Sequence, residues 1–262
     1  MSDESGFVVN KAAAEGFAQN AAVYEKSRPS YPAAAVACIV GRAGLGPGTR
    51  VIDLAAGTGK LTRLLVPSGA DVLAVEPVDA MRLELVDAIP GVEAVPGTAE
   101  AIPVDDGWAD AVTVAQAFHW FEPGKALREI RRVLKPGGCL VLTWNTRDRS
   151  YDWVRQFGEL LVDGDLERPY DMYYDVDYAA VVATAGGYTP VELFAIDWLQ
   201  PFDEELLVAR AASVSVVGAL ADDEREVVLD RVRRLARTHP DLAGRDQFGF
   251  PYTTRVFWCY KS

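Results

Sequence analysis

The chain has 262 residues, half of them hydrophobic, which is enough to bury a sizeable core in a single α/β domain with insertions. Asp and Glu outnumber Lys and Arg by 38 to 26, and the formal net charge of −12 disfavours nucleic acid and anionic membranes as partners. No uninterrupted apolar run approaches a membrane span, and the acidic start MSDESGFVVN is unlike a secretory signal. We therefore expect a soluble, cytoplasmic protein.

Hydrophobic periodicity predicts a first helix over 11–27, and a second helix over about 33–43 after the proline-containing RPSYP. Strands and helices alternate from there. The expected strands are 50–55, 71–76, 92–96, 110–116 and 138–144, and the expected helices are 59–66, 78–88 and 122–134. Strands such as DAVTVAQ and CLVLTW are apolar throughout, which indicates a sheet covered on both faces. This βαβ series predicts an α/β fold with a doubly wound, mostly parallel sheet.

The alternation ends after residue 146. A helix over 150–163 is followed by YDMYYDVDY (170–178), which holds four of the ten tyrosines. The remaining expected elements are a strand near 190–199, helices near 203–217 and 222–237, and a last strand over 252–260. We expect one domain over 1–262, whose core comprises about 33–146, 188–199 and 252–262. The expected lid segments are about 10–32, 147–187 and 200–250.

The three cysteines, Cys38, Cys139 and Cys259, are far apart in the sequence and lie in apolar surroundings. There is no C-x-x-C pair and no histidine nearby. The pattern favours buried, reduced thiols and predicts no metal or redox site.

The stretch RVIDLAAGTGKLTRLL (50–65) joins an apolar strand to a glycine turn, a form shared by three kinds of nucleotide-binding loop. A phosphate loop is excluded, because Leu54 stands at its first glycine position and Leu61 follows Lys60. A dinucleotide loop is disfavoured because Thr62 replaces the third glycine, and the chain has no Tyr-x-x-x-Lys motif of a nicotinamide oxidoreductase. The third possibility is a single nucleoside that carries an amino acid, for which small residues let the ligand approach the backbone.

Two acidic residues end the first two strands of the series. Asp53 ends the first, where it is expected to order the turn and face an ammonium group. Glu76 ends the second, 17 residues after Gly59, a spacing that suits a bidentate acceptor for both ribose hydroxyls. The alternative for Glu76 is a solvated acid before a proline turn. We favour the ribose contact, because the strand is otherwise apolar.

Five segments taken together resemble the class I S-adenosylmethionine-dependent methyltransferases: VIDLAAGTGKLT, VLAVEP, GTAEAIP, DAVTVAQAFHWF and LREIRRVLKPGGCLVLTWN. More narrowly, they resemble the small-molecule branch related to trans-aconitate and quinone-pathway methyltransferases, over about residues 20–146. The resemblance implies a seven-stranded Rossmann-like sheet whose last strand is antiparallel. It also implies S-adenosylmethionine as cofactor, S-adenosylhomocysteine as product, and a small-molecule acceptor.

The resemblance further assigns cofactor contacts. Where the family usually reads G-D-A-E, the chain reads Gly97-Thr98-Ala99-Glu100, so the usual acid at the adenine amino group is absent, and the Thr98 hydroxyl or the Ala99 backbone is left to serve. Arg28 would pair with the methionine carboxylate, or else lie at the surface beside a proline turn. The expected cofactor contacts are Tyr24, Arg28, Asp53, Ala55, Gly57, Gly59, Glu76, Pro77, Met81, Thr98, Ala99, Glu100 and Gln116.

On the acceptor side, His119 follows the fourth strand of the core and is the candidate general base, with helix packing or capping as the alternative. The tyrosine-rich run predicts an aromatic roof over a flat or apolar acceptor, or a cap held by its own rings. The expected substrate contacts are His119, Trp120, Asn145, Arg147, Tyr151, Tyr170, Tyr173, Tyr174 and Tyr252.

One alternative function stays open at the level of sequence. A protein that binds S-adenosylmethionine without methylating, such as a cyclase or isomerase, would use the same cofactor residues.

The helix expected over 122–134 carries several arginines. We interpret them as a solvated helix face: Arg128, Arg131 and Arg132.

Overall fold

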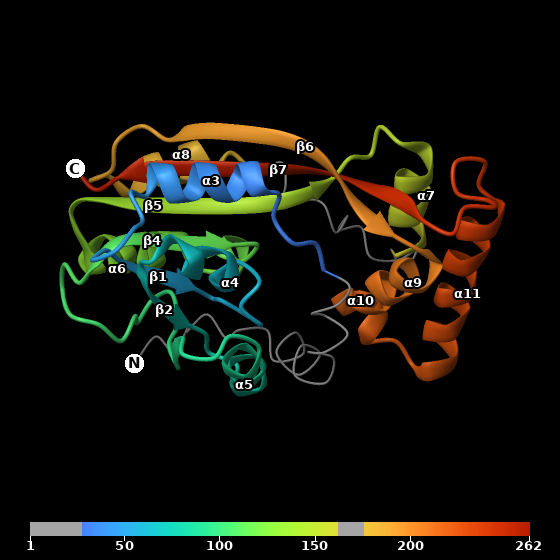
Figure 1. Ribbon diagram of the computed structural model, residues 1–262, viewed down its shortest axis with the longest axis horizontal. Helices are drawn as coiled ribbons and strands as arrows, with labels where there is room; N and C mark the ends of the chain where they lie inside the picture. Colours follow the sequence, from blue (N-terminus) through green and yellow to red (C-terminus); the bar gives the residue numbers. More distant parts are fainter. Residues whose placement is uncertain (1–27, 162–175) are drawn as a thin grey trace, which may run out of the picture.

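The computed structural model describes residues 28–161 and 176–262 (Figure 1). Within them, seven strands form one sheet in the order β3-β2-β1-β4-β5-β7-β6, in which β7 is antiparallel to both of its neighbours. The strands are β1 (Arg50–Leu54), β2 (Asp71–Val75), β3 (Glu93–Val95), β4 (Ala109–Ala115), β5 (Leu134–Arg147), β6 (Glu192–Phe202) and β7 (Phe248–Tyr260). The predicted fold, a seven-stranded sheet with an antiparallel last strand, is confirmed.

The helices fall close to their predicted ranges. They are α3 (Ala33–Arg42), α4 (Thr62–Leu65), α5 (Asp79–Ala88), α6 (Pro123–Val133), α7 (Asp152–Leu160), α8 (Tyr178–Ala185), α9 (Glu204–Ala212), α10 (Ser215–Gly218) and α11 (Asp222–Thr238), with 3-10 turns η1 (Val66–Ser68) and η2 (Phe118–Trp120). Two differences stand out: the expected helix over 203–217 is divided into α9 and α10, and α8 was not predicted. The helix expected over 11–27 lies outside the described residues.

The sheet is covered on both faces because its central strands are apolar on both. Neighbouring β1 residues enter different clusters: Ile52 packs with residues of α6 and α8, whereas Val51 packs with residues of α3 and α4. This alternation follows from the two-residue period of a strand. Helices therefore cover β1 on both faces of the sheet.

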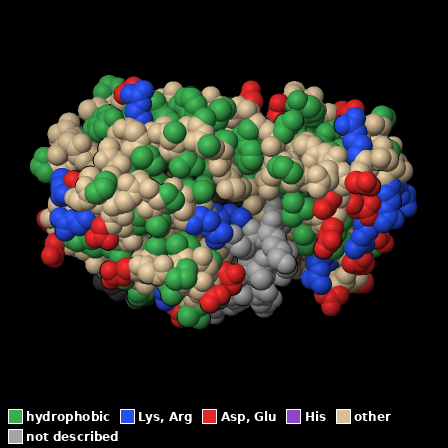
Figure 2. Space-filling model, viewed as in Figure 1, with side chains coloured by type: hydrophobic (Ala, Val, Ile, Leu, Met, Phe, Trp, Pro, Cys, Tyr) green, Lys and Arg blue, Asp and Glu red, His purple; other side chains and the backbone are tan. Residues whose placement is uncertain are grey.

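A helical lobe made of α7, α9, α10 and α11 lies at one end of the sheet, where β6 and β7 extend into it (Figure 1). Its core is a second apolar cluster that includes Phe157, Phe202 and Phe250. Charged side chains crowd the outer end of the lobe at α11 (Figure 2), where Arg237 pairs with Glu204 at 2.6 Å. None of the described helices combines the length and the hydropathy needed to cross a lipid bilayer.

Candidate active site

The carboxyl ends of β1, β2 and β4 meet at one edge of the sheet, since these strands are parallel neighbours. Ala55 and Gln116 directly follow β1 and β4, with φ of 54° and 58°. They are the only non-glycine residues of the described chain with positive φ. Left-handed backbone at such residues is strained and concentrates at functional sites. The backbone therefore marks this edge as the candidate site.

Asp53 holds the turn that follows β1. Its Oδ2 accepts a hydrogen bond from Thr62 Oγ1 at 2.6 Å, and its Oδ1 accepts one from Thr113 Oγ1 at 2.9 Å. The carboxyl is 1% exposed, and this burial raises its pKa to about 6, although the two threonine hydroxyls act in the opposite direction. Asp53 thus joins β1 to β4 and to the start of α4.

The two glycines of the turn have different environments, although both have positive φ. A Cβ at Gly59 would lie 2.6 Å from Ile89 Cδ1 and 2.9 Å from Leu85 Cγ, so this glycine is required by the packing of α5. Among the residues that the structure describes, a Cβ at Gly57 would meet only Met81 Sδ, at 3.9 Å. Within that part of the chain, Gly57 therefore has open space beside it, whereas Gly59 does not.

Glu76 connects β2 to the same turn. Its Oε2 accepts a hydrogen bond from Gly57 N–H at 2.9 Å, and its Oε1 accepts one from Val78 N–H at 3.0 Å. The side chain is 4% exposed, and burial raises its pKa. Each carboxylate oxygen has a further lone pair, so both can still accept a hydroxyl. Pro77 follows, half-buried.

The segment expected at the adenine edge follows β3. Thr98 is exposed and Ala99 is buried. Glu100 is turned toward α6, where its Oε1 accepts a hydrogen bond from Glu122 N–H at 3.1 Å. Gln116 lies farther along this edge of the sheet, and its Nε2 donates to Asn145 O at 3.4 Å.

His119 and Arg28 lie on the side of the site toward the helical lobe. Burial, and secondly the positive charge of Arg28, lower the pKa of His119 to about 4. Arg28 Nη2 donates to Ser213 O at 2.8 Å, at the end of α9. Trp120 is exposed, with its ring centroid 4.9 Å from that of His119. His119 is thus a neutral imidazole above about pH 5.

The residues expected after β5 differ in their surroundings. Asn145 is a connector: its Nδ2 donates to Ser30 O at 2.8 Å, and its Oδ1 accepts from Thr254 Oγ1 at 2.5 Å. Arg147 is opposite Tyr252 in the β5–β7 ladder and lies 5.7 Å from the Phe157 ring centroid. Within the described chain, no group hydrogen-bonds the buried Tyr252 hydroxyl.

Tyr151, just before α7, is 45% exposed. Four further candidates lie outside the described residues: Tyr24, Tyr170, Tyr173 and Tyr174. The structure therefore brings together the candidates at the ends of β1, β2 and β4. Arg28, Arg147 and Tyr252 each contact residues of the lobe.

Comparison with known proteins identifies the family. A family model described as "Methyltransferase domain" matches residues 52–142. An uncharacterized methyltransferase of Mycobacterium tuberculosis is 41% identical over 239 residues, which cover 91% of this chain and 92% of the relative. The chain belongs to the class I S-adenosylmethionine-dependent methyltransferases.

One more distant relative agrees with this assignment, and a solved structure shares the fold. An uncharacterized methyltransferase-like protein of Schizosaccharomyces pombe is 31% identical over 92% of this chain and 93% of its own length. A crystal structure described as a methyltransferase of an antibiotic biosynthesis pathway, from Anabaena variabilis, superimposes with a TM-score of 0.63 at 22% identity, covering 88% of this chain and 98% of that one. At that identity, the structural likeness shows the fold alone.

Sequence reasoning missed three polar residues that shape this methyltransferase site. Thr62 and Thr113 hold Asp53, and Arg132 of α6 holds the loop after β3. Thr113 is 60 residues from its partner, so no local spacing indicates the contact. The interpretation of Arg132 as part of a solvated helix face is wrong, because its guanidinium is hydrogen-bonded to the loop over 102–106.

Proposed function

We propose that this methyltransferase binds S-adenosylmethionine at the turn after β1 and transfers its methyl group to a small apolar or aromatic molecule. The observation that supports the cofactor site is the hydrogen bond between Gly57 N–H and the buried Glu76 carboxylate. It fixes the ribose acceptor against the turn before any ligand binds, which reduces the cost of binding. The proposed cofactor contacts are those expected from the sequence.

The charges at this edge suit a cationic ligand. Asp53 and Glu76 are both buried, and the charge of Glu76 is among the causes that raise the pKa of Asp53. Two neighbouring buried carboxylates favour a ligand that brings positive charge. S-Adenosylmethionine brings a sulfonium and an ammonium group, and its methyl carbon leaves the sulfur as the bond to the acceptor forms.

Aromatic side chains suggest the acceptor side. Tyr252 stacks on Phe250 and Trp198, with ring centroids 4.8 Å and 5.6 Å apart. Together with Arg147, its hydroxyl would orient a polar group of a flat acceptor, while the rings exclude water. The proposed acceptor contacts remain those expected from the sequence, of which Asn145 is already engaged on both ends of its amide.

His119 is the proposed base for an acceptor that keeps its proton near neutral pH. Its low pKa leaves the imidazole lone pair available throughout the physiological range, although it makes the group a weak base. An acceptor that is already deprotonated needs no base, and alignment with the methyl group then supplies most of the catalysis.

Calorimetric titration with S-adenosylmethionine, S-adenosylhomocysteine and NAD tests this proposal. We expect the first two to bind and NAD not to bind. Glu76→Ala should weaken S-adenosylhomocysteine binding by about tenfold or more, because charge-assisted hydrogen bonds to the ribose are lost. Asp87→Ala, at an exposed position of α5, is the matched control.

Three outcomes would decide between functions. Binding of NAD in place of the adenosyl ligands would favour an oxidoreductase and overturn the proposal. Unchanged affinity in Glu76→Ala would remove this residue from the site. Tight binding of S-adenosylmethionine, with no S-adenosylhomocysteine released on any acceptor of a broad aromatic and aliphatic panel, would favour a non-methylating protein of the cyclase or isomerase kind.

A further inference from the structure

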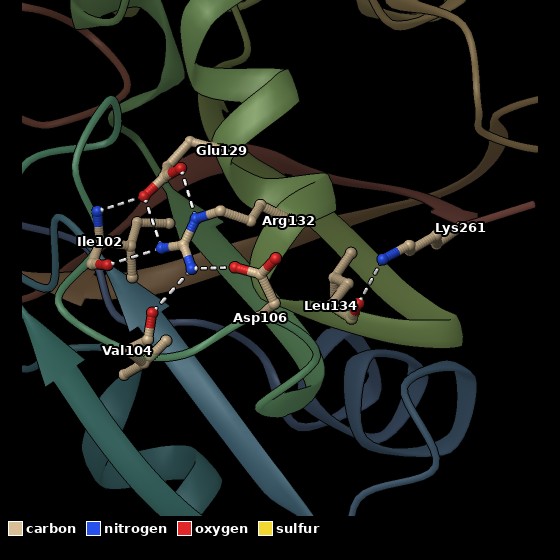
Figure 3. Close-up of polar contacts among 7 residues, drawn as sticks. All are labelled: Ile102, Val104, Asp106, Glu129, Arg132, Leu134 and Lys261. Atoms are coloured by element: carbon tan, nitrogen blue, oxygen red, sulfur yellow. Dashed lines mark hydrogen bonds and ion pairs between the residues drawn. The ribbon is translucent and has the colours of Figure 1, made fainter.

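Arg132 and Glu129, one turn apart on α6, hold the loop between β3 and β4 (Figure 3). Arg132 Nη2 donates to Ile102 O at 3.0 Å, and its Nη1 donates to Val104 O and Asp106 Oδ1, both at 2.8 Å. Its Nε and Nη2 also donate to the two Glu129 oxygens at 2.8 Å. These contacts match the five N–H donors of a guanidinium, so the whole group is used.

Glu129 and Arg132 supply main-chain hydrogen bonds to Ile102 of the kind that a neighbouring strand would provide. Glu129 Oε1 accepts the hydrogen bond of Ile102 N–H at 2.8 Å, while Arg132 donates to the carbonyl of the same residue. The Ile102 side chain is buried, and buried main-chain groups must be paired to avoid a desolvation cost. Loss of the pair would therefore release this part of the loop from α6.

The same loop is held to the cofactor edge at its beginning. Glu76 N–H donates to Val95 O at 3.1 Å, and a Cβ at Gly97 would lie 2.7 Å from Val75 Cγ1, so the segment starts directly beside Glu76. Glu100 Oε1 then accepts from Glu122 N–H at the start of α6. The segment over 98–100 thus lies between the ribose acceptor and two attachments to α6.

We propose that Arg132 and Glu129 are positioning residues for the adenosine half of the cofactor. They touch no ligand themselves, and they act by holding the segment over 98–100 in the conformation that the purine meets. This inference rests on the proposed function, which places the adenine edge at that segment. A loop held in its bound conformation pays no ordering cost on binding, so its release should lower affinity for the adenosine half.

Calorimetry with S-adenosylhomocysteine and with 5′-methylthioadenosine, which keeps the nucleoside but lacks the amino acid, tests the inference. Arg132→Gln should weaken both ligands by about tenfold, because only part of the population is binding-competent. Arg132→Lys should restore only part of the affinity, since an ammonium cannot reproduce the fork of donors. Arg128→Gln, on the exposed face of the same helix, should leave both affinities unchanged.

A control of matched stability separates positioning from simple destabilisation. Leu229→Ala in α11 removes a buried side chain in the lobe, away from the loop, and should lower the melting temperature without weakening either ligand. If Arg132→Gln lowers the melting temperature like Leu229→Ala but binds both ligands as the wild type does, the inference is overturned. If Arg132→Gln does not fold, Glu129→Gln is judged by the same criteria. Failure of the wild type to bind either ligand would instead overturn the proposed function, and this inference with it.

Discussion

At the residue scale, the buried Asp53 carboxyl destabilises the folded protein when it is charged. Burial raises its folded-state pKa from 3.8 to about 6. Between these values the folded protein binds the proton more tightly than the unfolded chain does. Its contribution to stability is therefore fully present below about pH 4 and is lost as the pH rises through about 6.

This predicts a pH-dependent difference between the wild type and Asp53→Asn. The wild type should lose about 2 kcal/mol of unfolding free energy from this residue between pH 4 and 7, and the variant should lose less. Urea unfolding of both proteins at several pH values in this window measures the difference. Parallel pH dependences in the two proteins would contradict the assigned burial of the charge.

His119 offers a second test at this scale, because its lowered pKa has two causes. Burial is the larger cause and the charge of Arg28 is the second. Arg28→Gln should therefore raise the His119 pKa from about 4, yet leave it below the ordinary value of 6.5. NMR titration of the ring resonances checks this directly, since the chain has only two histidines. A His119 pKa that does not move in the variant would show that Arg28 is not its neighbour.

At the element scale, the packing of α5 on the turn after β1 distinguishes structure from binding. Gly59→Ala places a methyl group against Ile89 and Leu85, so it should destabilise the protein by about 2 kcal/mol or more. Gly57→Ala meets no such obstacle, and its cost should be limited to about 1 kcal/mol of backbone strain.

The same two variants should differ in the opposite sense in ligand binding. Gly57→Ala places its methyl group in the space proposed for the cofactor and should weaken S-adenosylhomocysteine more than Gly59→Ala does. Thermal unfolding and calorimetry on both variants measure the two effects. Equal losses of affinity would mean that Gly57 is no closer to the ligand than Gly59.

The elements of the core were predictable because their patterns are local. The strands around Ile52 and Val112 are short apolar runs bounded by turn residues, and they form β1 and β4 as expected. The division of 203–217 was not predictable, because α9 ends at Ala212 through backbone hydrogen bonds at Ser213 rather than at a glycine or proline. α8 was not predictable either, because its sequence YAAVVATA is apolar almost throughout and shows no helical alternation of apolar and polar residues.

The candidate site was predictable only in part, for a physical reason. Acids at strand ends, such as Glu76, are visible in the sequence because the strand pattern places them. Their partners are set by the way that distant strands and helices meet, as with Thr113 and Asp53 or Arg132 and Ile102. No pairing of this kind is encoded in local spacing.

At the scale of the whole molecule, β5 and β7 run between the core of the sheet and the helical lobe. β5 extends from the sheet core to Arg147, and β7 extends from the lobe, at Phe250, to the core, at Cys259. Because β5 pairs with β4, which ends at the proposed cofactor edge, and with β7, which extends into the lobe, the sheet fixes the proposed cofactor and acceptor sides relative to each other. The two proposed ligands would therefore lie side by side, the cofactor at the carboxyl edge and the acceptor toward the lobe.

A crystal structure of the protein with S-adenosylhomocysteine tests the central claim most directly. We predict ribose hydroxyls on the Glu76 carboxylate, the amino-acid end against the turn at Gly57, and the purine beside the segment over 98–100. An adenosyl ligand bound elsewhere on the molecule, with this edge of the sheet filled only by solvent, would contradict it.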